Sequence, residues 1–162
     1  MKKAIYPGSF DPITNGHIDI VKRALSVFDH VLIAITQNQE KSSLFTIEER
    51  QDLIRQSLDS ERIEVKTFDG LLVDFAKDEK IGFIVRGLRA ASDFEYEFQL
   101  AAMNRHVNSQ VDSVFFMTSS ETYFLSSRLV KEVAMLGGDV EKMVPSPVAK
   151  ALQEKRKLHQ NI

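Results

Sequence analysis

Short apolar runs alternate along the chain with segments in which apolar residues recur every three or four positions. Continuous apolar runs of this length are typical of strands buried on both faces, whereas the recurring spacing is typical of amphipathic helices. The pattern predicts strands at residues 4–6, 31–35, 81–85 and 114–117, with an alternating strand at 63–67. It predicts helices at residues 15–28, behind Thr46, behind Gly70, behind Ser92, behind Ser126 or Ser127 through Leu136, and from Ser146 onward.

Residues that favour helix ends support several of these boundaries. In a capping box, a hydroxyl side chain and an acid three residues later satisfy each other's backbone N–H groups. Thr46 with Glu49 and Ser92 with Glu95 match this pattern. The glycine pair after Leu136 is expected to end one helix, and the serine–proline pair at residues 146–147 to start the last one.

Strands and helices alternate five times, which predicts a doubly wound α/β fold of about five parallel strands with helices on both faces. A chain of 162 residues, 43% of them hydrophobic, closes one sizeable core, so we expect a single domain over residues 1–162. In such folds ligands bind beyond the carboxyl ends of the strands, where the strand order reverses. The polar segments at 8–17, 41, 86–89 and 119–127 all follow strands, so we expect them to gather at that edge.

Composition narrows the classes of function. The net charge of −2 gives no basic excess for a nucleic-acid or membrane surface. The absence of cysteine excludes disulfides, thiolate metal sites and a cysteine nucleophile. No signal sequence and no apolar run of about 20 residues is present, so the chain is expected to be soluble and cytoplasmic.

The loop after the first strand carries two glycines, two prolines and His17 at the start of the expected helix. Backbone N–H groups and the positive end of the helix dipole favour an anion beside this histidine. The alternative is a tight strand–helix connection in which His17 only caps the helix. The spacing of Gly16 and His17 leaves both interpretations open.

Three other segments offer cations or hydroxyl groups, each with an ordinary alternative. Arg86 and Arg89 flank a glycine in an expected turn and could reach one anion together. The alternative is a surface turn whose arginines pair with Asp93, Glu95 or Glu97. Lys41 could be a solvated surface lysine, and Ser126 and Ser127 could be simple helix caps rather than a phosphate cradle.

No hydroxyl or thiol has the neighbours of an activated nucleophile, and the common nucleotide-binding glycine motifs are absent. The set that gathers instead, His17, Lys41, Arg86, Arg89 and a serine-bearing helix start, is cationic and hydrogen-donating. Such groups stabilise negative charge on phosphates. An attacking phosphate oxygen is already ionised at neutral pH, so its reaction needs positioning and no general base.

Residues 14–17 (Thr-Asn-Gly-His) resemble the T/H-x-G-H signature of the nucleotidylyltransferase superfamily. Residues 126–131 (Ser-Ser-Arg-Leu-Val-Lys) resemble its second signature, a hydroxyl-rich helix start followed by a basic residue. Segments 6–17, 86–90, 93–97 and 129–133 together resemble the bacterial phosphopantetheine adenylyltransferases, in order and over nearly the whole chain.

This resemblance implies a Rossmann-like fold and an activity. ATP and 4′-phosphopantetheine would give 3′-dephospho-coenzyme A and pyrophosphate, a late step of coenzyme A synthesis, by direct in-line attack on the α-phosphorus. Mg²⁺ would be carried by the ATP phosphates, with no metal ligand from the protein. The resemblance also implies a homohexamer, and coenzyme A would be an inhibitor that binds the same pocket.

The resemblance also implies roles for individual residues. His17 would contact the α-phosphate and stabilise the transition state. Lys41 and Arg86 would bind the phosphate of phosphopantetheine, Leu72 would line its pantetheine arm, and Ser9 would bond to the phosphate region. ATP contacts would come from Ser9, Phe10, His17, Gly87, Leu88, Arg89, Glu97, Thr122, Tyr123, Phe124, Leu125, Ser126, Ser127 and Arg128. Arg128 departs from the family pattern, which has a small hydroxyl residue at this position.

Two other functions remain open. The chain could transfer a nucleotide to another phosphorylated acceptor, such as nicotinate mononucleotide or glycerol phosphate. It could also be a nucleotide-binding module without catalytic activity, although the presence of His17, Lys41, Arg86 and Arg89 together disfavours that alternative.

Overall fold

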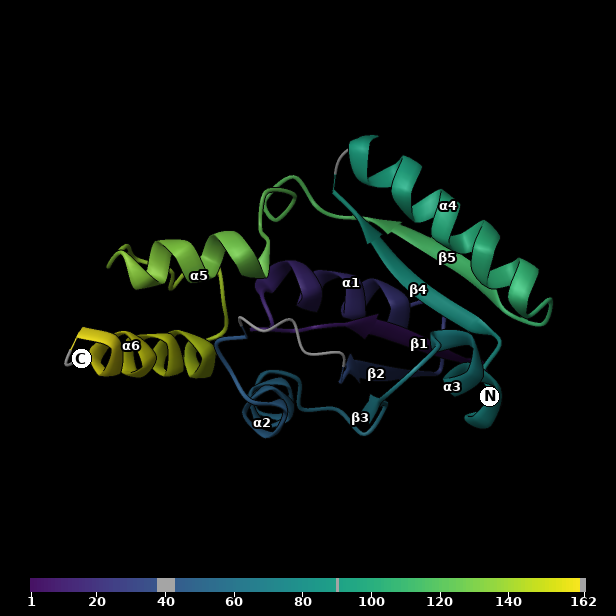
Figure 1. The fold of residues 1–162 in the computed structure, drawn as a ribbon, viewed down its shortest axis with the longest axis horizontal. Helices are drawn as coiled ribbons and strands as arrows, with labels where there is room; N and C mark the ends of the chain where they lie inside the picture. Colours follow the sequence, from purple (N-terminus) through teal and green to yellow (C-terminus); the bar gives the residue numbers. More distant parts are fainter. Residues whose placement is uncertain (38–42, 90, 161–162) are drawn as a thin grey trace.

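The structure, a computed structural model, describes residues 1–37, 43–89 and 91–160. Within these ranges five strands form one sheet: β1 (Lys3–Gly8), β2 (His30–Thr36), β3 (Ile63–Phe68), β4 (Phe83–Leu88) and β5 (Asp112–Met117). The helices of the same ranges are α1 (Asn15–Leu25), α2 (Ile47–Ser57), α3 (Leu72–Asp78), α4 (Ala91–Val107), α5 (Ser127–Met135) and α6 (Ser146–Gln160). The predicted strand–helix alternation is confirmed (Figure 1).

All strand pairs are parallel, in the order β3-β2-β1-β4-β5. The chain first winds outward from β1 through β2 to β3, then returns to place β4 on the other side of β1. The strand order therefore reverses between β1 and β4. In a parallel sheet, a crevice lies outside the carboxyl ends of two such strands, and ligands bind there. The predicted doubly wound fold is confirmed.

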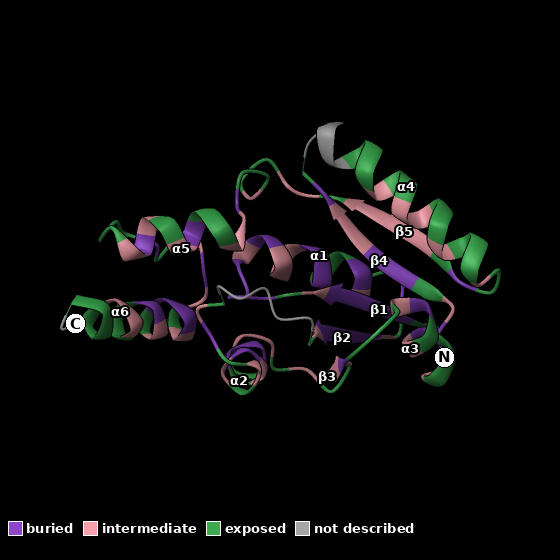
Figure 2. Ribbon diagram, viewed as in Figure 1, coloured by how far each residue is buried: buried purple, intermediate pink, exposed green. Residues whose placement is uncertain are grey.

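Side chains of each central strand alternate between two apolar clusters, one on each face of the sheet. Ala4 and Tyr6 of β1 belong to the larger cluster, whereas Ile5 belongs to the smaller one. Helices α1, α2, α5 and α6 contribute to the larger cluster, and α3 contributes to the smaller cluster. Figure 2 shows β1 and β2 buried in the middle of the molecule. Burial on both faces explains why these strands read as continuous apolar runs.

Helices α5 and α6 lie beyond the carboxyl edge of the sheet, on the left of Figure 1. They contact one another, and α6 also contacts α2. Gly137, with φ of 89°, lies just after the end of α5 in the left-handed conformation that glycine adopts readily. Its N–H donates to Ala134 O and the N–H of Gly138 donates to Val133 O, which ends the helix as predicted.

The structure confirms some predicted boundaries and corrects others. Thr46 and Glu49 form the expected capping box of α2. Helix α1 ends at Leu25 rather than Phe28, although Phe28 is still buried in the larger cluster. The second expected capping box is wrong, because α4 already begins at Ala91 and Ser92 lies inside it. Helix α6 begins at Ser146 itself, so this serine is helical rather than a preceding cap.

The register of the fourth strand also differs from the prediction. We expected a strand at residues 81–85 followed by a turn, but β4 spans Phe83–Leu88. Arg86, Gly87 and Leu88 therefore lie in the strand, and the turn begins only at Arg89. The strand continues past the apolar run because residues 86–88 still pair with residues 115–117 of β5, and Arg86 and Gly87 border a cavity rather than the core.

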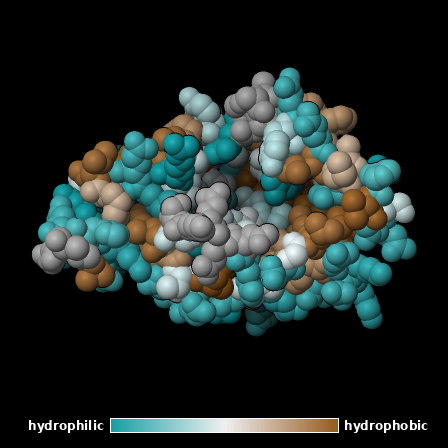
Figure 3. Space-filling view, in the orientation of Figure 1, coloured by the Kyte–Doolittle hydropathy of each residue, from teal (hydrophilic) through white to brown (hydrophobic). Residues whose placement is uncertain are grey.

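Strand β5 and helix α4 form the least buried part of the sheet. No residue of β5 is fully buried: Asp112 and Met117 at its ends are exposed, and the four residues between them are half-buried. Apolar side chains of α4 such as Phe94, Phe98 and Met103 are also exposed. The two elements lie together at one edge of the molecule (Figure 1). Apolar side chains interrupt the hydrophilic surface in Figure 3.

Candidate active site

A cavity of about 240 Å³ opens at the carboxyl ends of β1 and β4, where the strand order reverses. Six segments of the chain contribute to it, and most of the cations and hydroxyl groups identified in the sequence face it. The lining residues are Tyr6, Pro7, Gly8, Ser9, Thr14, Gly16, His17, Ile20, Arg86, Gly87, Arg89, Glu97, Thr118, Leu125, Ser126 and Ser127. The expected convergence at this edge is confirmed for segments 8–17, 86–89 and 119–127, whereas Lys41 lies outside the described residues.

His17 is held by the first turn of α1. Thr14 is the N-cap, and its backbone N–H donates to Nδ1 of His17 at 3.0 Å. The N–H of His17 donates in return to the Thr14 hydroxyl oxygen at 3.4 Å. Since Nδ1 accepts a hydrogen bond, the proton of the neutral ring lies on Nε2. His17 therefore caps the helix and also offers an N–H donor, so the two sequence interpretations describe one arrangement.

The surroundings of His17 keep its ring neutral. Phe10 packs against it with ring centroids 5.1 Å apart, and Tyr6 lies next to both rings. Burial lowers the pKa of His17 to about 4, and the charge of Arg89 contributes to the decrease. At neutral pH this histidine is thus a hydrogen-bond donor without charge, rather than one of the cations that the sequence suggested.

Arg86 and Glu97 form one wall of the cavity. Nε of Arg86 donates to Oε2 of Glu97 at 2.6 Å, and Nη2 donates to Oε1 at 2.5 Å. This two-pronged ion pair joins β4 to α4 and fixes the plane of the guanidinium. One of the carboxylate partners that the sequence allowed is therefore used. The bonds involve Nε and Nη2, so Nη1 lies outside the ion pair.

Gly87 brings α1 close to β4 beside this wall. A Cβ atom at this position would lie 3.0 Å from Cγ1 of Ile20, closer than nearly all real side-chain contacts. The absence of a side chain lets Ile20 pack directly over the strand. Helix α1, which carries His17, therefore packs closely against β4, which carries Arg86.

Two lining residues were missed by the sequence reasoning and carry polar groups. Tyr6 lies in the buried part of β1, and burial raises the pKa of its phenol, so the hydroxyl stays protonated. Thr118 directly follows β5, as the other site residues follow their strands. The rule that ligands bind at carboxyl ends of strands points to Thr118, whereas Tyr6 has the appearance of an ordinary core residue.

The start of α5 closes the cavity through Ser126 and Ser127. The Ser126 hydroxyl accepts a hydrogen bond from Leu129 N at 3.2 Å and is the N-cap. Ser127 Oγ donates to Pro12 O at 2.7 Å, which ties the helix to the first loop. Simple capping is therefore present, and both serines also face the cavity.

Several predicted site residues do not line this cavity. Phe10 and Leu88 are buried, with Phe10 packed against His17. Leu72 begins α3 and packs against the smaller apolar cluster. Thr122, Tyr123, Phe124 and Arg128 lie nearby in sequence but outside the lining, and Arg128 is exposed. Lys41 lies outside the described residues.

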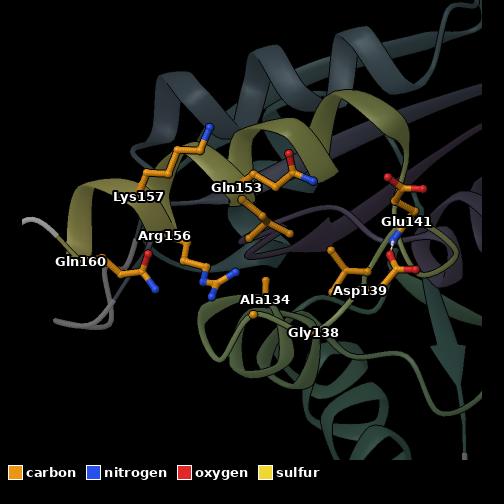
Figure 4. A pocket seen from close by; sticks show the side chains of 11 residues that line it. Ala134, Gly138, Asp139, Glu141, Gln153, Arg156, Lys157 and Gln160 are labelled. Atoms are coloured by element: carbon orange, nitrogen blue, oxygen red, sulfur yellow. Dashed lines mark hydrogen bonds between the residues drawn. The ribbon is translucent and has the colours of Figure 1, made fainter.

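A larger cavity of about 490 Å³ lies between α5, α6 and the segment that joins them (Figure 4). Its lining includes Arg156, whose Nε is buried without a hydrogen-bond partner in the described structure. In Figure 4 this side chain points toward Ala134 and Gly138. Among the described residues predicted to bind substrate, none lines this cavity, so the smaller one at the strand ends is the candidate active site.

Metal-ligand clusters and membrane spans are both absent from the described residues. Across the described ranges, no three or more histidine, aspartate and glutamate side chains are grouped so that they could hold a metal ion. In the same part of the chain, the helices are all too short or too polar to cross a membrane.

The chain matches the profile of the family described as Cytidylyltransferase-like over residues 5–133. It is 54% identical over 156 residues to the phosphopantetheine adenylyltransferase of Geotalea daltonii, covering 96% of this chain and 97% of the relative. It is 52% identical over 155 residues to that of Anaeromyxobacter sp. strain K, covering 95% and 94%.

The fold is also similar to a solved structure, a candidate nicotinate-nucleotide adenylyltransferase from Vibrio parahaemolyticus. The TM-score is 0.67, with 18% sequence identity and 97% of each chain covered. At this identity the similarity supports the fold alone. The high identity to the curated relatives carries the assignment further: the chain belongs to the cytidylyltransferase-like family and to the phosphopantetheine adenylyltransferases.

Proposed function

We propose that this protein transfers the adenylyl group of ATP to the phosphate of 4′-phosphopantetheine, giving 3′-dephospho-coenzyme A and pyrophosphate in coenzyme A synthesis. The substrate assignment rests on the similar proteins, which are named phosphopantetheine adenylyltransferases. The observation that carries the chemistry is the cavity at the strand switch point, which is lined by a neutral histidine and by Arg86 in its ion pair with Glu97.

The proposed reaction is one in-line displacement. An oxygen of the acceptor phosphate forms a bond to the α-phosphorus of ATP, while the bond to the bridging oxygen breaks and pyrophosphate leaves with the electron pair. The acceptor oxygen is already ionised, so no general base is required. This agrees with a cavity in which His17 is neutral and Nδ1 is already occupied by Thr14 N.

His17 would act through its Nε2–H. Negative charge builds on the α-phosphate oxygens in the transition state, and a fixed donor stabilises that charge without reorganising. The capping box with Thr14 fixes the ring and its tautomer before substrate binds. We propose that this histidine is the main catalytic residue.

The acceptor phosphate would bind at Arg86 through Nη1 and through the positive charge of the guanidinium. The ion pair with Glu97 holds this guanidinium in place. Lys41 is proposed as its second ligand and Ser9 as a donor to the phosphates. Leu72 would line the pantetheine arm, since α3 begins shortly after the carboxyl end of β3.

ATP would lie along the β4 and α5 side of the cavity. Proposed contacts are Phe10, Gly87, Leu88, Arg89, Glu97, Thr122, Tyr123, Phe124, Leu125, Ser126, Ser127 and Arg128. Mg²⁺ would arrive with the ATP phosphates, because it keeps most of its water and binds phosphate oxygens readily. Glu97, a carboxylate in the lining, is already engaged by Arg86, which favours a metal held by ATP over one held by the protein.

The acceptor is tested by measuring pyrophosphate release with ATP and Mg²⁺. The acceptors compared are 4′-phosphopantetheine, pantetheine, nicotinate mononucleotide and glycerol phosphate. We expect release with 4′-phosphopantetheine and almost none with pantetheine, which lacks the ionised nucleophile. Efficient adenylylation of pantetheine would contradict the mechanism, and preference for another phosphorylated acceptor would contradict the substrate.

We also propose a homohexamer, as the family resemblance implies. The exposed apolar side chains of α4 support assembly, because a helix that is apolar on several sides is normally buried by a partner. Coenzyme A, which contains the product, is proposed to compete for the same cavity. Because the reaction consumes ATP, we propose a cytoplasmic location.

A further inference from the structure

Asp11 is the centre of a buried polar network that borders the candidate active site without lining it. The residue is 5% exposed. Oδ1 accepts a hydrogen bond from Phe45 N at 2.9 Å, and Oδ2 accepts one from Leu44 N at 3.1 Å. Oδ2 also accepts a bond from Nζ of Lys131 at 2.5 Å. One carboxylate therefore joins the first loop, the segment before α2, and α5.

Arg50 connects the same segments from the other side. Its guanidinium is 3.5 Å from Oδ1 of Asp11, and only 3% of the residue is exposed. Nε donates to Phe45 O at 2.9 Å, and Nη1 donates to Ser9 O at 3.2 Å. The backbone of Ser9, a lining residue, is thus held by a side chain of α2.

These bonds link two segments that line the cavity, the first loop and α5, to a third segment before α2. The first loop supplies Ser9 and Thr14 to the lining, and α5 supplies Ser127, which is itself bonded to Pro12 O. The third segment, at residues 43–46, directly follows the part of the sequence that contains Lys41. The network lies where the phosphates of both substrates are proposed to meet.

The charges in this network are balanced by partners. Burial raises the pKa of Asp11, but hydrogen bonds from Lys131, Phe45 and Leu44 outweigh burial and lower it overall. The carboxylate therefore stays ionised at neutral pH. A buried charge is tolerated when it is paired and hydrogen-bonded, and removing one member leaves the others uncompensated.

We propose that Asp11 is a positioning residue that acts through Lys131 and Arg50. It holds the first loop, residues 43–46 and α5 in one arrangement, so that the attacking phosphate oxygen, the α-phosphorus and the leaving group are aligned. This inference rests on the proposed adenylyl transfer. Misplacing reacting groups by about 1 Å lowers the rate by about 10²-fold. This loss of rate would occur although the groups that bind substrate remain in place.

The test compares steady-state kinetics of the full-length protein with ATP and 4′-phosphopantetheine. Asp11→Asn is expected to lower kcat by about 30- to 100-fold, and Lys131→Met by about tenfold or more, with each KM within about threefold of wild type. Lys131→Arg, which retains the charge, should recover kcat to within about threefold of wild type. Loss of stability alone would leave kcat unchanged well below the unfolding temperature.

Lys155→Met is the matched control. Lys155 donates to Glu49 at 2.7 Å and its side chain is 24% exposed, against 26% for Lys131. This pair joins α6 to α2 beside the same network but holds no lining segment. Its kcat should stay within about twofold of wild type, and an equal loss of kcat in Lys155→Met and Lys131→Met would overturn the proposal.

A double-mutant cycle separates positioning from direct substrate binding by Lys131. If Lys131 acts through Asp11, the double variant should be no slower than Asp11→Asn within about threefold. If the losses of kcat in the two single variants multiply in the double variant, the proposal is overturned, because Lys131 would then serve the substrate directly. An unchanged kcat in Lys131→Met would also overturn the proposal. The comparison of Lys131→Met with wild type tests the proposal even if Asp11→Asn does not fold. No turnover by wild type would instead contradict the proposed function.

Discussion

The two strand–helix units that border the cavity have the same order of elements but differ in how completely they are buried. In the β1–α1 unit the strand is buried on both faces, and α1 presents one apolar stripe to the larger cluster. In the β4–α4 unit, α4 exposes 48% of Phe94, 58% of Phe98 and 60% of Met103. The neighbouring edge strand β5 is only half-buried.

The difference shows that each unit contributes differently to the site. The β1–α1 unit is completed within one chain, and its capping box holds His17 in one orientation. The β4–α4 unit holds Arg86 through an ion pair with Glu97 on a helix whose outer side is unpartnered in the single chain. Catalytic stabilisation is therefore expected to depend on the first unit, and acceptor binding and assembly on the second.

The largest expected effect lies in the β1–α1 unit. His17→Ala removes the Nε2–H donor and should lower kcat by about 10²-fold or more, the usual cost of losing one fixed donor to a developing charge. Binding of ATP should weaken far less, because the donor acts mainly in the transition state. Steady-state kinetics and ATP titration measure both. The exposed His159 provides the control variant His159→Ala, and a His17→Ala rate within about tenfold of wild type would contradict the assigned role.

The same histidine should make stability depend on pH. Its folded-state pKa of about 4 lies below the ordinary value near 6.5, so the unfolded chain binds the proton more readily. The stabilising contribution is complete above pH 6.5 and is lost as the pH falls toward 4, by on the order of 3 kcal/mol. Urea unfolding at several pH values should show a flatter dependence for His17→Ala than for wild type. Equal dependence in both proteins would contradict the neutral, buried ring.

In the β4–α4 unit, Arg86→Ala should lower kcat/KM for 4′-phosphopantetheine by about 10- to 100-fold, since it removes both binding charge and alignment. Glu97→Gln should lower it by roughly tenfold, because the guanidinium remains but loses its fixed orientation. The measurement is kcat/KM for 4′-phosphopantetheine in both variants, and Arg86→Ala should show the larger loss. A Glu97→Gln rate equal to wild type would mean that the ion pair has no part in placing Arg86.

The exposed side of α4 should be required for assembly. Phe98→Glu places a charge in an apolar surface and should reduce the particle mass in light scattering by a factor of two or more. Burying one such aromatic side chain is worth roughly 1.5–3 kcal/mol. Val27→Glu is the matched control on the β1–α1 side, where Val27 is 54% exposed. A monomeric wild type at micromolar concentration would contradict the proposed hexamer.

The smallest effect is expected at Arg128, which is exposed in the first turn of α5. A cation there is disfavoured by the helix dipole by about 0.3–1 kcal/mol unless an anion lies close. Arg128→Ser should change the KM for ATP by less than about tenfold. A larger increase that disappears for AMP would show that Arg128 binds the outer phosphates.

Much of the fold could be predicted because it depends on local patterns. Runs such as Val31–Ile35 predict strands buried on both faces, and Thr46 with Glu49 predicts the start of α2. The winding rules for parallel sheets then place the polar segments at one edge. The end of β4 could not be predicted in this way, because Arg86 and Gly87 are strand residues that border a cavity, and no apolar period marks them.

For the site, the sequence alone determined which residue types converge and at which edge of the sheet. Only the tertiary structure decided their chemical state. The neutral ring of His17 depends on burial against Phe10, and the orientation of Arg86 depends on Glu97 of another element. The network around Asp11 joins residues that are 33 to 120 positions apart. Burial and long-range pairing depend on the packing of distant segments, which a local sequence pattern does not contain.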